Sequence, residues 1–172
     1  MTFSVAPELV TLAHRLADAA GEVIRPLFRA DDLVVEIKED VSPLVTQADR
    51  NAEQAIRDIL RRERPQDGIW GEEFGKYNVD AEYVWILDPI DGTTPFTLAR
   101  VSFGTLIGLY HRTQGFIYGI ADQPILRDRW SGGRGHGVVF NGKHVQAAAK
   151  TEMEKLRVTV TNPLRFSPLL QR

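Results

Sequence analysis

The sequence predicts an α+β protein in which two N-terminal helices pack on an antiparallel β-meander. Three observations predict this fold class. Two early segments carry apolar residues at helical spacing, the chain beyond residue 100 consists of short β-rich runs, and glycine, proline or Asn-Gly separates those runs. Helices followed by a run of neighbouring strands are typical of an α+β layer.

The helical pattern lies near the N-terminus. Apolar side chains recur at helical spacing from Leu9 to Leu27, and Pro7 stands where a first helical turn accepts proline. A short strand is expected at 33–37, and a second helix from about Thr46 to Arg62.

The rest of the chain is expected to be mainly strand. A turn at 65–68 precedes a series of strands, at 69–73, 83–87, 103–111, 116–122, 127–131, 137–140 and 156–161. Asn141-Gly142 predicts a tight hairpin, because both turn positions require a positive φ.

Composition narrows the functional class. The chain has 172 residues, 43% of them hydrophobic and 26% charged, which is enough for one domain with a packed core. A net charge of −2 gives no basic field for nucleic acid, and the lack of cysteine excludes disulfides and a thiolate nucleophile. The N-terminus does not resemble a signal peptide, and no apolar run reaches membrane-spanning length, so we expect a cytoplasmic protein without a membrane partner.

The most informative stretch surrounds two aspartates. A buried strand is expected to deliver Asp88 at its end, Pro89 to end that strand, and Asp91 to follow on a tight turn. Two adjacent carboxylates repel each other and raise a pKa unless a cation lies between them. Mg²⁺ suits such an oxygen-only pair, because it takes one or two carboxylates and otherwise binds water and phosphate oxygens.

A possible anion site follows directly. Residues 92–95 are expected to begin a helix with a threonine cap, and free N–H groups at a helix start attract phosphate. Other roles stay open at this point: Asp88 and Asp91 as turn caps, Glu72 and Glu73 as solvated charge, and Asp49 as an acid opposing a helix dipole. An EF-hand is excluded, because Ala99 stands where its bidentate glutamate belongs.

Three ordered motifs resemble those of the inositol monophosphatase family, over about residues 8–160. The motifs are Lys38-x-Asp40-x-Ser42-Pro43-x-x-Thr46-x-x-Asp49, Gly71-Glu72-Glu73 and Asp88-Pro89-Ile90-Asp91-Gly92-Thr93. The segments 103–107, Asp122-Gln123-Pro124 and Arg129-Trp130 most resemble the histidinol-phosphatase branch.

The resemblance implies a set of site residues. The metal ligands would be Glu72, Asp88, the backbone carbonyl of Ile90, and Asp91, holding two or three Mg²⁺ ions that Mn²⁺ can replace. The catalytic residues would be Glu72, Thr93 and Asp49, with Thr93 orienting the attacking water. The phosphate contacts would be Asp91, Gly92, Thr93 and Thr94.

The resemblance also implies a hydrolase acting on a small phosphorylated alcohol. Histidinol phosphate is favoured, consistent with histidine biosynthesis, inositol phosphate comes next, and a homodimer is expected. Family chains are longer and end in a second α/β region, which supplies another aspartate to the metals. Residues 1–172 are therefore expected to form the N-terminal metal- and phosphate-binding part of the layered αβαβα sugar-phosphatase fold, with the C-terminal α/β domain absent. The alternative is a truncated, weakly active or inactive fragment that binds only metal and phosphate.

Two local features bear on these expectations. Pro95 has no N–H, so one potential phosphate donor is lost. The segment 137–144 nearly matches a P-loop, but His144 stands where a serine or threonine should bind Mg²⁺.

Overall fold

A computed structural model describes residues 4–37 and 44–147, and it confirms the α+β class. Helix α1 spans Pro7–Leu27, α2 spans Gln47–Glu63, and the short α3 spans Thr93–Thr97. The strands are β1 (Val35–Ile37), β2 (Leu44–Thr46), β3 (Gly68–Gly71), β4 (Gly75–Tyr77), β5 (Tyr83–Asp91), β6 (Gly104–His111), β7 (Gly115–Gln123), β8 (Asp128–Gly133), β9 (Gly137–Phe140) and β10 (Lys143–Val145). None of the helices in the described ranges combines the length and the apolar composition that a membrane-spanning helix requires.

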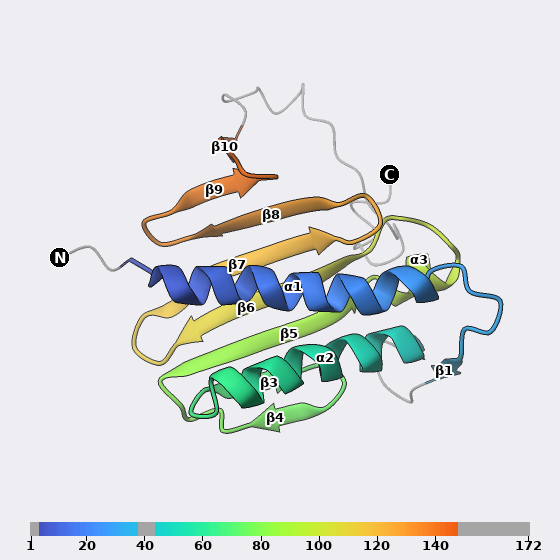
Figure 1. Cartoon of the computed structure of the whole chain (residues 1–172), viewed down its shortest axis with the longest axis horizontal. Helices are drawn as coiled ribbons and strands as arrows, with labels where there is room; N and C mark the ends of the chain where they lie inside the picture. The colour runs from blue at the N-terminus through green and yellow to red at the C-terminus, as the bar shows by residue number, and fades with distance from the viewer. Residues whose placement is uncertain (1–3, 38–43, 148–172) are drawn as a thin grey trace, which may run out of the picture.

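Eight strands form one large sheet in the order β10-β9-β8-β7-β6-β5-β3-β4 (Figure 1). All neighbours from β5 to β10 are antiparallel, as a meander requires, whereas β3 and β5 pair in parallel. The separate pair β1–β2 lies beside the start of α2. The parallel pair brings the ends of β3 and β5 to the same edge of the sheet.

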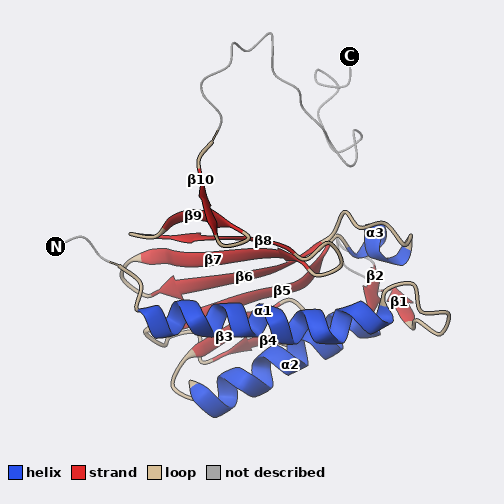
Figure 2. Cartoon of the chain, turned by 45° about the horizontal axis from the view of Figure 1, so that its top comes forward, coloured by secondary structure: helices blue, strands red, loops and turns tan. Residues whose placement is uncertain are grey.

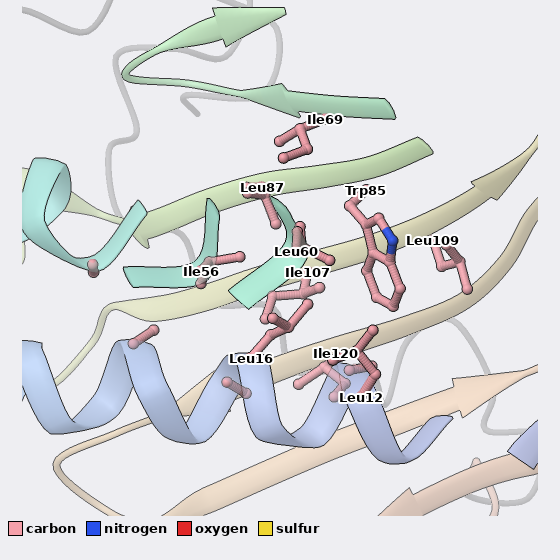
Figure 3. Packing of buried hydrophobic residues seen from close by; sticks show 14 of the residues in the cluster. Leu12, Leu16, Ile56, Leu60, Ile69, Trp85, Leu87, Ile107, Leu109 and Ile120 are labelled. Carbon is pink, nitrogen blue, oxygen red and sulfur yellow. The ribbon is translucent and has the colours of Figure 1, made fainter. Parts of the chain in front are cut away.

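Both long helices cover one face of the sheet (Figure 2). Their apolar stripes meet the inward residues of the central strands, where Leu16, Ile56, Trp85 and Leu109 are almost completely buried (Figure 3). Each fully buried side chain of this size stabilises the fold by about 1.5–3 kcal/mol relative to its exposed state. The core therefore fixes the strand ends that carry the acidic residues.

The opposite face of the sheet carries a row of glycines. Gly108 pairs with Gly119, and Gly119 pairs with Gly132, so these glycines lie side by side on three adjacent strands. Phe116 and Trp130, both exposed, flank the row. Because successive strand residues alternate between faces, this surface is the one turned away from α1 and α2.

Several sequence predictions needed correction. Pro89 does not end the strand: β5 continues to Asp91, with a register shift against β6 between Asp88 and Asp91. The irregular pairing accommodates proline, because a bulge does not require its missing N–H. β4 was not predicted, since all three of its residues are exposed and show no alternation.

The hairpin prediction is confirmed. Phe140 pairs with Lys143, and both intervening residues, Asn141 and Gly142, have positive φ, at 46° and 79°. The strand expected at 156–161 lies outside the described residues.

Candidate metal and phosphate site

The carboxylate of Asp88 lies at the centre of the candidate site. Gly71 pairs with Leu87, and the Glu72 amide donates to the Leu87 carbonyl at 3.1 Å. Glu72 therefore leaves β3 beside the point where β5 presents Asp88. The buried Oδ1 atom of Asp88 has no hydrogen-bond partner among the described residues. A buried polar atom without a partner is costly, which indicates that an external group completes this site.

Among the described residues, the charged side chains that shift the pKa of Asp88 are acidic. Burial raises the pKa of Asp88 to about 8, and the charges of Glu72, Asp91 and Asp49 act in the same direction. Ionising this carboxyl adds a negative charge to a group of negative charges. A divalent cation would reverse that effect, because it favours the charged form of every carboxylate near it.

Asp49 is held by the start of α2. The Thr46 hydroxyl accepts from the Ala48 amide at 3.1 Å, and the Thr46 amide and hydroxyl donate to Asp49 Oδ2 at 2.8 and 2.6 Å. The other carboxylate oxygen, Oδ1, lies 3.4 Å from the Thr93 hydroxyl. Burial raises the pKa of Asp49, and the hydrogen bonds from Thr46 and Thr93 oppose that rise. Asp49 thus acts as an N-terminal acid of its helix and also contacts the next predicted site residue.

The start of α3 differs in detail from the prediction. Gly92, not a threonine, is the N-cap residue, and its φ of 100° lies in the left-handed region that favours glycine. Thr93 is the first helical residue, and its hydroxyl lies 3.3 Å from the Ile90 carbonyl. The hydroxyl is thus directed into the site instead of capping the helix.

The predicted site residues lie near one another, but their side chains do not form a complete set of ligands around a metal ion. Within 4–37 and 44–147, no three histidine, aspartate or glutamate side chains converge tightly enough to surround an ion as they stand. Asp49 faces Thr46 and Thr93, while Glu72 and Asp91 are exposed. The motif residues from Lys38 to Pro43 lie outside the described ranges.

The donor set nevertheless fits Mg²⁺. Every candidate ligand is an oxygen, from Glu72, Asp88, Asp91 or the Ile90 carbonyl, and Mg²⁺ prefers such ligands together with water. The buried Oδ1 of Asp88, which has no hydrogen-bond partner among the described residues, supplies an oxygen whose charged form a cation would favour.

Sequence reasoning missed Glu53 and Arg57. Both are buried on α2, and the Arg57 Nε atom donates to Glu53 Oε1 at 2.7 Å. The available signal was an acid–base pair four residues apart on the apolar face of a helix, beside Ala52 and Ile56.

Residues 6–167 match the family model described as the inositol monophosphatase family. The chain belongs to this family. It is 41% identical over 158 residues to the bifunctional phosphatase IMPL2 of Arabidopsis thaliana, covering 91% of this chain and 45% of that protein. It is 36% identical over 161 residues to the histidinol-phosphatase of Streptomyces coelicolor, covering 92% of this chain and 59% of that protein.

Solved structures show the same family fold. An inositol monophosphatase from Zymomonas mobilis superposes with a TM-score of 0.71 at 47% identity, covering 87% of this chain and 56% of that one. The inositol monophosphatase of Thermotoga maritima gives a TM-score of 0.74 at 26% identity, covering 82% and 54%. This family member therefore spans about half the length of the relatives it matches.

Proposed function

We propose that this chain forms the metal- and phosphate-binding part of a magnesium-dependent phosphomonoesterase that acts on a small alcohol monophosphate. The observation that carries the proposal is the buried Oδ1 of Asp88, which has no hydrogen-bond partner in the described part of the chain and lies among the charges of Glu72, Asp91 and Asp49. Membership of a phosphatase family supports the same reaction class. Glu72, Asp88, Asp91 and the Ile90 carbonyl would hold the metal, as two or three ions.

The side chains suggest how the reaction is arranged. When bound, Mg²⁺ would supply positive charge to the phosphoryl oxygens and make a water molecule more acidic. The Thr93 hydroxyl can donate its single hydrogen either to the Asp49 carboxylate or to the Ile90 carbonyl. Its oxygen lone pairs are then available to accept a hydrogen bond from the attacking water and so to orient it, with Glu72 behind it. The N–H groups of Gly92, Thr93 and Thr94, beside Asp91, would contact the phosphate.

Histidinol phosphate is the favoured substrate within this proposal. The support is resemblance: the segments 103–107, Asp122-Gln123-Pro124 and Arg129-Trp130 resemble the histidinol-phosphatase branch. Overall identity does not separate the two substrates, since the Streptomyces coelicolor histidinol-phosphatase is 36% identical and the Zymomonas mobilis inositol monophosphatase is 47% identical. The test is kcat/KM for histidinol phosphate against inositol 1-phosphate. A higher value for inositol 1-phosphate would refute the substrate and leave the reaction class intact.

A protein that binds metal and phosphate without turnover is the second candidate. The observation in its favour is that no three acidic or histidine side chains within the described ranges close around an ion. A phosphatase assay with and without Mg²⁺ separates the two, since only the enzyme releases phosphate in a metal-dependent way.

We also propose a cytoplasmic homodimer, as the sequence predicts, and light scattering on the purified chain tests the dimer.

A further inference from the structure

Glu53 binds the turn that carries Glu72. Its carboxylate is fully buried and accepts hydrogen bonds from the Glu73 amide at 2.8 Å and from the Phe74 amide at 3.1 Å. These two amides directly follow Glu72 in the chain. The backbone on the C-terminal side of Glu72 is therefore attached to α2 by a single carboxylate.

Arg57 completes the attachment. It donates to Glu53 through Nε at 2.7 Å and to the Gly75 carbonyl through Nη2. Its guanidinium carbon atom also lies 5.8 Å from the centroid of the Phe74 ring, within the range of a cation–π contact. The pair thus holds the turn between β3 and β4 at residues 73, 74 and 75.

The absence of a side chain at Gly71 leaves room for the Glu53 carboxylate. A Cβ atom added to Gly71 would overlap the Glu53 carboxylate. Gly71 has no positive φ, so its lack of a side chain is explained by the room that the carboxylate needs. An apolar pair could fill the same volume, but it could not accept hydrogen bonds from the amides of Glu73 and Phe74, so the turn would lose its attachment to α2.

We infer that Glu53 and Arg57 are positioning residues that hold Glu72 beside Asp88 for metal binding. The inference rests on the proposed metal site. Glu72 has a fixed backbone on both sides: its own amide is bonded to Leu87 of β5, and the next two amides are bonded to Glu53. Outer partners of this kind orient metal ligands and contribute to metal affinity.

The test measures Mg²⁺ affinity of the full chain by calorimetry, in wild type and Glu53→Gln, at a temperature where both are folded. The glutamine keeps the shape but removes the charge and one acceptor. We expect its Mg²⁺ Kd to rise about tenfold, as for other partners of metal ligands. Amide exchange at Glu73 and Phe74, measured without metal, should become faster.

Asp67→Asn is the matched control. Asp67 is also a buried carboxylate, accepting from Arg64 at 2.9 Å and Trp85 at 3.0 Å, but it precedes β3 at the end away from Glu72. We expect this variant to lose thermal stability and keep the wild-type Kd.

Two outcomes overturn the positioning role alone: an unchanged Kd in Glu53→Gln, or an equal loss of affinity in Asp67→Asn. Absence of Mg²⁺ binding by the wild-type chain would instead overturn the metal site, and the positioning role with it.

Discussion

Asp49 and Asp88 are both acidic residues withdrawn from solvent, but their partners differ. Asp49 accepts hydrogen bonds from the amide and hydroxyl of Thr46, and its second oxygen faces Thr93. The Oδ1 atom of Asp88 has no partner among the described residues, and Glu72 adds to the negative charge around it. The fold itself accommodates the first carboxylate, whereas the second is suited to an external cation.

We predict that Asp88→Asn removes most of the stabilisation that Mg²⁺ gives to the wild-type chain. An ion that binds only the native state stabilises it by about 2.7 kcal/mol at a hundredfold excess over Kd. Asparagine keeps the shape of the side chain but lacks the charge that attracts the ion. The measurement is the melting temperature with and without MgCl₂.

Asp80→Asn serves as the control for this prediction, because Asp80 is an exposed residue just before the start of β5. Its response to Mg²⁺ should match wild type. An unchanged metal response in Asp88→Asn would contradict the assignment of Asp88 as a ligand.

Some of these residues could be predicted from the sequence, and others could not. Asp88 could be found because it follows a buried apolar strand and precedes Asp91 by three positions. For Glu53 the sequence offers only its spacing from Arg57; its contacts could not be predicted, since an acid at a helical position is usually solvated and only the folded structure shows which amides reach it.

At the level of single elements, the stability of α2 depends on the residues at its start. Thr46 and Asp49 form a capping box, which satisfies amides that the helix itself leaves unpaired. The same contacts set the position of the Asp49 carboxylate. The start of this helix therefore combines a stabilising role with a place in the candidate site.

Thr46→Ala should lower the free energy of unfolding by about 1 kcal/mol, the usual cost of losing a helix cap. Thr46→Ser should retain most of the stability, because serine keeps the hydroxyl. Urea unfolding followed by circular dichroism measures both. Equal midpoints for alanine and wild type would show that the cap is not needed.

The strands show where local sequence signals fail. The meander from β6 to β9 could be predicted because each strand is bounded by its own turn residues. The parallel pairing of β3 with β5 had no local signal, since β4 lies between them in the chain but pairs with the other side of β3, at the edge of the sheet. Pro89 misled the prediction, because the register shift that accommodates it depends on the neighbouring strand.

At the scale of the whole molecule, the two faces of the sheet differ. One face is covered by α1 and α2, while the other exposes Phe116 and Trp130 beside the glycine row. Exposed apolar patches of this kind mark surfaces that bind other apolar groups.

We expect the purified chain to enhance the fluorescence of an anilinonaphthalene sulfonate dye through this surface. The double variant Phe116→Lys/Trp130→Lys should reduce the enhancement by at least about half, because charged side chains disrupt an apolar patch. Thr11→Lys/Asn51→Lys adds the same charge to exposed positions on the helices and should have little effect. Equal dye binding in both double variants would contradict this location.

The contact between Glu53 and Gly71 also constrains how the sequence can change over evolutionary time. A mutation of Gly71 to any larger residue meets the carboxylate, although the local backbone would tolerate a side chain. Shortening Glu53 first would make room, but it would leave the amides of Glu73 and Phe74 without their acceptor. Either single mutation is therefore expected to be selected against, and we expect related sequences to retain both residues or to change both. Their dependence on each other is epistasis that arises from one buried carboxylate.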